Sequence, residues 1–82
     1  MKTYKVYMDL TLIIYELTKF DLKEYNTSFP IVFVESDDPD GACYIALYRL
    51  IQIILRQDAS LETTTLCRRL KNDIRITKVF VP

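Results

Sequence analysis

The segment that most constrains the fold is a helix-start signal at residues 36–41, which is followed by a long amphipathic stretch. Asp38 is a favourable N-cap, Pro39 suits the first helical position, and Asp40 complements the positive end of a helix dipole. The sequence therefore predicts a helix from about Pro39 to Arg56. Its apolar stripe recurs at helical spacing and consists of Cys43, Ala46, Leu47, Leu50, Ile51 and Ile54.

Before this helix, the N-terminal part of the chain has apolar residues with period two, the spacing of a β-strand. These residues are Tyr4, Val6, Met8, Leu10, Leu12 and Ile14. We therefore expect a strand over Thr3–Tyr15, whose opposite face turns apolar at Ile13 and Tyr15. A helix beginning at Asp9 competes with this strand, because the apolar residues that follow also fit helical spacing. Those residues are Leu10, Ile13, Ile14 and Leu17.

A second strand is predicted at Phe29–Val34, where every residue is apolar. A run that is apolar on both faces is typical of a strand covered on both sides. Pro30 fits only at the beginning of such a strand, where no backbone donor is required. The preceding segment, Glu16–Ser28, has the mixed polarity of a connection that includes a turn of helix.

The C-terminal third admits two interpretations at residues 61–67. The threonines there favour a strand, whereas Ser60 is a suitable N-cap for a short helix. In that helix the inward residues would be Leu66, Cys67 and Leu70. Lys71-Asn72-Asp73 is expected to form a turn before a last strand at residues 74–81.

These elements predict a single α+β domain over residues 1–82. We expect a small antiparallel sheet with one main amphipathic helix packed on one face. The order would be β-β-α-β, with one further strand if residues 61–67 are extended.

Composition argues against catalysis and against a bound cofactor or metal. The chain has no histidine, which removes imidazole acid-base steps, and its single glycine is too few for a phosphate-binding loop. An EF-hand loop with Gly41 at its sixth position needs a carboxylate where Leu47 stands. Cys43 and Cys67 have apolar neighbours, so we expect them to be reduced and buried. The prediction is a protein that is not an enzyme.

The chain is also expected to be cytoplasmic, with no role at a membrane. Its most apolar stretch, Leu10–Tyr15, is far shorter than the ~20 residues that cross a bilayer. No signal-peptide cleavage site and no disulfide framework point to secretion. Eleven basic and eleven acidic residues cancel, so no net charge draws the chain to an anionic surface.

The charges are nevertheless distributed unevenly. Residues 1–40 hold four basic and eight acidic groups, whereas residues 41–82 hold seven basic and three acidic ones. A cluster of cations near the C-terminus consists of Arg68, Arg69, Lys71, Arg75 and Lys78. It is interpreted either as a nucleic-acid-binding stripe or as a basic strand that pairs with acidic neighbours in the sheet.

Six tyrosines and four phenylalanines make the chain rich in aromatic residues. One helix covers only one face of a sheet, so Tyr7, Ile13 and Tyr15 on the opposite face need another cover. That cover is either residues 16–25, with Phe20 and Leu22 as a lid, or a partner molecule, or a second copy of the same chain. The outer side of the helix offers a second partner-binding patch or a solvated face. Its residues are Tyr44, Tyr48, Arg49 and Arg56.

The run Val34–Ala42, in which a strand passes through an acidic cap into an amphipathic helix, resembles an arrangement in small phage-encoded proteins. Several anti-CRISPR proteins share this strand-helix-strand style. The resemblance implies a non-catalytic protein that inhibits a larger protein complex by occupying its surface. We therefore expect a protein-binding module, with a nucleic-acid-binding domain or a homodimeric structural module as the alternatives.

Overall fold

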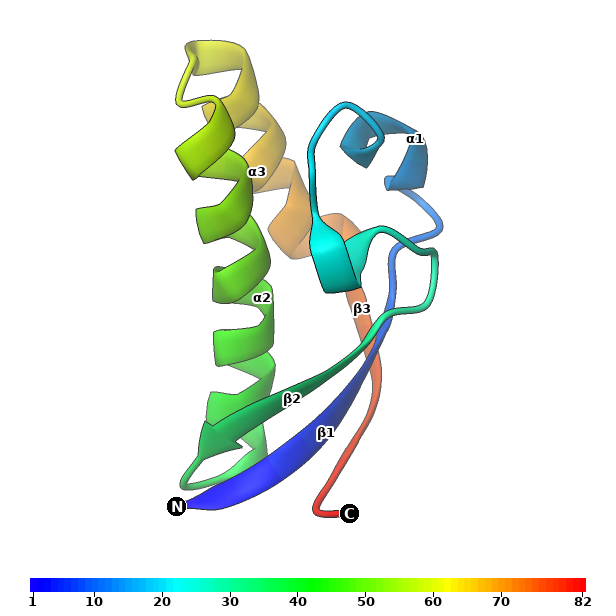
Figure 1. Cartoon of the computed structure of the whole chain (residues 1–82), viewed down its shortest axis with the longest axis vertical. Helices are drawn as coiled ribbons and strands as arrows, with labels where there is room; N and C mark the ends of the chain where they lie inside the picture. The colour runs from blue at the N-terminus through cyan, green and yellow to red at the C-terminus, as the bar shows by residue number, and fades with distance from the viewer.

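The computed structural model describes all 82 residues and contains a three-stranded antiparallel sheet. Strand β1 (Lys2–Asp9) is central and pairs with β2 (Ile31–Ser36) on one side and β3 (Arg75–Phe80) on the other. The sheet occupies one end of the molecule, where both chain termini also lie (Figure 1). The expected α+β class is confirmed.

The long helix α2 (Pro39–Gln57) forms as the sequence predicts. The Asp38 carboxylate accepts a hydrogen bond of 2.6 Å from the backbone N–H of Gly41, and Pro39 occupies the first turn. The single glycine leaves room for the Ser36 hydroxyl, which a Cβ atom at residue 41 would displace. At ~1.5 Å per residue, α2 runs along most of the 35 Å length of the molecule.

A second main helix, α3 (Leu61–Asp73), decides between the two interpretations of residues 61–67. Ser60 caps it by accepting a hydrogen bond from the Thr63 N–H at 3.3 Å. The hydroxyls of Thr64 and Thr65 bond to the carbonyls of residues 60 and 61, which makes threonine compatible with a helix here. The expected turn at residues 71–73 is wrong, because helical hydrogen bonding continues to the Ile74 N–H.

Helix α2 packs on one face of the sheet, which we call the inner face, and α3 packs against α2. The most deeply buried strand residues on this inner face are at most 5% exposed, and they are Tyr4, Val6, Met8, Val32 and Val34. From α2 they meet Ala46, Leu50 and Ile54, and α3 adds Leu66, Cys67 and Leu70, the inward residues of the helical interpretation. The sheet and the helices thus share one core.

The predicted strand Thr3–Tyr15 is too long. After Asp9 the chain turns, because the Asp9 carboxylate accepts hydrogen bonds from both the N–H and the hydroxyl of Thr11, at 2.9 and 2.7 Å. The short helix α1 (Ile14–Leu17) follows. Burial of Leu10, Ile13 and Leu17 follows the competing helical spacing.

Residues 16–25 do not form the lid over the outer face of the sheet that was one of the expected covers. Their buried side chains extend the core beyond the sheet, where α1, α3 and the 3-10 turn η1 (Lys23–Tyr25) gather around the C-terminal half of α2 (Figure 1). The Tyr25 hydroxyl donates to the Ala46 carbonyl at 3.0 Å. The Gln57 side chain bonds to the backbone N–H and C=O of Asp21. This segment therefore packs on the helical side.

Candidate functional site

The side of the sheet that faces away from the helices carries a compact grid of large side chains. Residues directly opposite each other in antiparallel strands point to the same face. One row of the grid is Phe33, Lys5 and Phe80, and the next is Ile31, Tyr7 and Lys78. We call these six residues the outer sheet face.

An irregularity in β3 creates one third of this grid. Strict alternation would place Ile76, Lys78 and Phe80 on a single face. The register shifts between Tyr7 and Met8, so that Lys78 pairs with Tyr7 while Ile76 pairs with Met8. The extra residue, Thr77, lets Ile76 pack against the core while Lys78 and Phe80 remain on the outer sheet face.

The centre of the outer sheet face combines two aromatic rings with two ammonium groups. The Tyr7 and Phe80 rings stack at a centroid distance of 5.8 Å and an interplanar angle of 19°. The Lys5 ammonium lies 5.2 Å from the Tyr7 centroid and 5.8 Å from that of Phe80. The Lys78 ammonium lies 5.9 and 4.8 Å from the same two centroids. Each lysine is therefore within cation–π range of both rings.

No segment of the chain covers this surface. Phe33 is 54% exposed and Ile31 is 42% exposed, although both belong to a strand expected to be covered on both sides. That expectation is wrong because all the helices lie on the inner side. Lys5 and Lys78 take part in none of the ion pairs, which join residue 1 to Asp37, Arg49 to Glu24, and Arg69 to Glu16.

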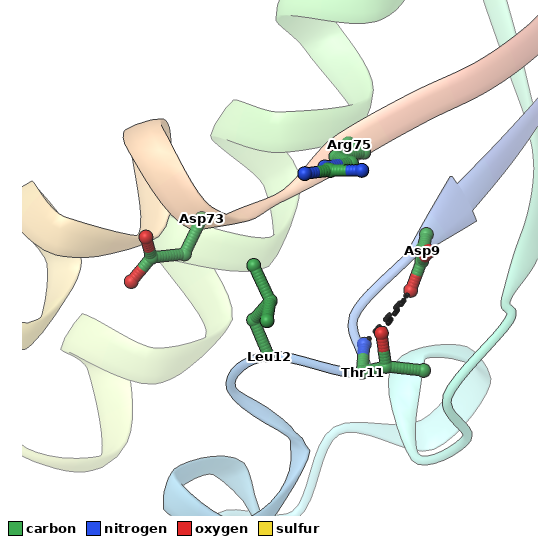
Figure 2. A pocket seen from close by; sticks show the side chains of 5 residues that line it. All are labelled: Asp9, Thr11, Leu12, Asp73 and Arg75. Carbon is green, nitrogen blue, oxygen red and sulfur yellow. Dashed lines mark hydrogen bonds between the residues drawn. The ribbon is translucent and has the colours of Figure 1, made fainter.

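Polar pairs flank the grid at both ends. Thr3 pairs with Glu35 at one end, and Asp9 pairs with Arg75 at the other. Figure 2 shows Asp9, Arg75 and Asp73 around a small polar cavity of about 100 Å³. Hydrogen bonds from the side chain and backbone of Thr11 lower the pKa of the Asp9 carboxyl, with a further contribution from the Arg75 charge. The Thr11 hydrogen bonds terminate β1, and the strand register places the basic Arg75 opposite the acidic Asp9.

The three strand residues predicted as partner anchors do not come together. Tyr7 lies on the outer sheet face. Ile13 is 1% exposed and belongs to the core, so its expected position on a free face is wrong. Tyr15 is 88% exposed but is carried by α1, away from the sheet. The early end of β1 is the physical reason for both differences.

The four residues predicted on the outer side of the main helix, which we call the helix patch, lie on the surface of α2. They are Tyr44, Tyr48, Arg49 and Arg56. Tyr44 and Tyr48 stack at 5.8 Å, and Gln52 donates a 2.7 Å hydrogen bond to the Tyr48 hydroxyl. Arg49 is instead held within the chain, because its guanidinium donates to the Phe33 carbonyl at 3.2 Å and lies 3.9 Å from Glu24. Arg56 is exposed and lines a shallow groove beside Tyr48.

The five C-terminal cations are distributed over two elements. Arg68, Arg69 and Lys71 are on α3, where Arg69 forms a 2.8 Å ion pair with Glu16. Arg75 and Lys78 are on β3, at the flank and the centre of the outer sheet face. Only Lys78 joins the aromatic cluster.

Sequence reasoning missed four of the six residues of the outer sheet face, and it named Lys78 only as part of a nucleic-acid-binding stripe. The four missed residues are Lys5, Ile31, Phe33 and Phe80. The apolar run at residues 29–34 was the available signal, since a strand that is apolar on both faces needs two covers and the chain supplies one. Phe80 and Lys78 had no such signal, because the bulge that turns them outward is a property of strand pairing.

The two cysteines are unpaired, with Cys67 buried and Cys43 half-buried. Burial raises the pKa of both thiols, and the nearby Asp40 raises that of Cys43 further. The structure contains no group of three or more cysteine or carboxylate side chains that could hold a metal ion.

Comparison of the chain with protein-family models, with curated proteins and with solved structures found no match. None of the helices combines the length and the apolar character that crossing a membrane requires.

Proposed function

We propose that this protein is a non-catalytic protein-binding module that uses the outer sheet face to occupy a surface of a larger protein. The supporting observation is the exposure of Ile31 and Phe33 beside the stacked Tyr7 and Phe80 rings. Contiguous apolar surface of this kind marks interaction sites in soluble domains, and aromatic residues are frequent energetic anchors of interfaces.

The scaffold favours binding because the anchors are already ordered. Each residue of the outer sheet face is fixed by strand pairing, and the same strands are held from behind by the core. A preformed surface loses little conformational entropy on association, so more of the apolar burial contributes to affinity. The mechanism we propose is steric: the docked module blocks access to the surface it covers, as an inhibitor of a larger complex does.

A capture experiment with paired variants tests this proposal. The tagged chain, Phe33→Ser and Tyr44→Ser are used as baits in an extract of the encoding organism, and the captured protein is then purified for a binding titration. Both substitutions remove one exposed aromatic side chain, so both baits are expected to fold. We expect Phe33→Ser to weaken binding by at least ~10-fold, the effect of an interface anchor, and Tyr44→Ser by less than ~2-fold.

If Tyr44→Ser weakens binding and Phe33→Ser does not, the binding site is the helix patch. Equal binding by all three baits would contradict the proposal. Nuclease treatment that abolishes capture would favour a nucleic-acid partner, and a doubled mass in light scattering that Phe33→Ser halves would favour a homodimer.

A further inference from the structure

We infer that the partner surface is acidic as well as apolar, and that its carboxylates dock against the ammonium groups of Lys5 and Lys78. This inference rests on the proposed function and specifies its partner. The observation that carries it is the arrangement of two unpaired lysines around one aromatic pair at the centre of the outer sheet face.

The four central residues, two on β1 and two on β3, form a square in which like side chains lie diagonally across from each other. Lys5 is opposite Phe80 and Tyr7 is opposite Lys78, so the rings stack along one diagonal and the lysines occupy the other. Both ammonium groups thus approach the same ring pair. A carboxylate placed over this square would be attracted by both charges while its aliphatic stem contacts the rings.

A partner with a purely apolar surface would bind this face with an unfavourable desolvation free energy. Lys5 is on the central strand, directly between Phe33 and Phe80, so any partner that buries these two rings also removes water from the Lys5 ammonium. An ammonium that loses its hydration without gaining an anion is strongly destabilising. A partner that supplies a carboxylate avoids this cost and gains a charge-assisted hydrogen bond.

A second copy of the chain fits this face poorly. In a two-fold symmetric contact each protomer presents the same patch, so the six grid residues of neither protomer would supply a carboxylate to the lysines of the other. The net positive centre of the grid therefore favours a different, acidic protein over self-association.

A nucleic-acid strand also matches the face less well than an acidic protein segment. Phosphates follow one another along the whole backbone, and carboxylates of Glu35 and Asp9 flank the grid at its two ends. The Tyr7 and Phe80 rings stack on each other and carry lysines, which leaves less ring surface for bases.

The test is an NMR titration of the ¹⁵N-labelled full chain with two matched peptides and one oligonucleotide. One peptide contains leucines and two glutamates, its twin has glutamines in place of the glutamates, and the third probe is oligo-dT. We expect the glutamate peptide to bind about 5- to 10-fold more tightly than its twin at ~0.1 M salt, with shifts centred on residues 5–7 and 78–80. This preference should largely disappear at ~1 M salt, where charges are screened.

Two variants locate the effect, one double substitution and one single-substitution control. Lys5→Met with Lys78→Met keeps the apolar stems, so it should reduce the preference for glutamate to less than ~2-fold without weakening the glutamine peptide. The control is Lys71→Met, which removes an exposed cation from α3 and should leave the preference unchanged.

Each outcome has a defined meaning. Equal binding of the two peptides would overturn the acidic-partner inference while leaving an apolar docking face in place. Tighter binding of oligo-dT would replace the protein partner by a nucleic acid. Absence of shifts on the outer sheet face with all three probes would overturn the inference, whereas the proposed function is decided separately by Phe33→Ser.

Discussion

Val34 and Phe33 are neighbours in β2, yet their surroundings are opposite. Val34 is 1% exposed under the helices, and Phe33 is 54% exposed on the outer sheet face. The same contrast runs through β1, where Val6 is fully buried and Lys5 and Tyr7 are only partly covered. Hydrophobicity alone therefore does not decide burial in this sheet; the position of the covering helices does.

This difference between the two faces means that one set of residues stabilises the fold and another set is available for binding. Inner-face residues contribute to the folding free energy through contacts with α2 and α3, whereas outer-face residues have apolar surface still available to another molecule. Substitutions on the two faces should consequently affect different measurements, which gives three ways to test the comparison.

The largest expected effect comes from the adjacent pair in β2. Val34→Ala removes two buried methyl groups and should lower the free energy of unfolding by about 2 kcal/mol. Phe33→Ala removes a much larger side chain but should change it by no more than ~0.5 kcal/mol, because that side chain is largely in water. Urea denaturation followed by circular dichroism measures both values. A large loss for Phe33→Ala would show that the outer sheet face is packed in solution.

The second effect concerns the core extension at Tyr25. Burial, with a smaller contribution from the neighbouring Glu24 charge, raises the pKa of Tyr25 to about 12 from an ordinary 10.0. The unfolded chain then loses this proton first, so the stabilising contribution is complete below pH 10 and is lost as the pH rises towards about 12.

Tyr25→Phe should cost about 1 kcal/mol near neutral pH, because the hydrogen bond to the Ala46 carbonyl is lost. It should also make stability less dependent on pH between 10 and about 12. Urea denaturation across this range measures both effects. Tyr15→Phe on the exposed surface of α1 is the control and should change neither, whereas an unchanged alkaline slope in Tyr25→Phe would contradict the assignment.

The smallest effect is the internal coupling of the outer sheet face. A double-mutant cycle with Tyr7→Ala and Phe80→Ala should give a coupling energy of about 0.5–1 kcal/mol, typical of a stacked aromatic pair. The cycle of Tyr7→Ala with Tyr44→Ala combines residues on the outer sheet face and the helix patch and should give none. A coupling near zero for Tyr7 and Phe80 would indicate that the rings do not stack in solution.

Much of the fold was predictable because its signals are local. The start of α2 depends on Asp38, Pro39 and Asp40, which act within one helical turn, and its buried stripe follows from helical period. The helical alternative for residues 61–67 was available from Ser60, but the threonines there are an equal signal for a strand. Only the formed helix, with its hydroxyl-to-carbonyl bonds, separates the two.

The candidate site was only partly predictable. Tyr7 follows from the alternation in β1. Of the covers considered for the opposite face, the internal one at residues 16–25 does not form, since Ile31 and Phe33 are exposed. Ile13 and Tyr15 were misplaced because the interaction of Asp9 with Thr11 ends the strand early. Lys78 and Phe80 required knowledge of the bulge opposite Tyr7.

The sequence by itself thus determined the class of fold, the main helix and its inward face, since caps and periodicity are set by residues close together in the chain. The tertiary structure decided which sheet face stays open, because that depends on where distant segments pack. Residues 13–25 lie against α2, where Tyr25 and Gln57 hold them, and so leave the outer sheet face uncovered.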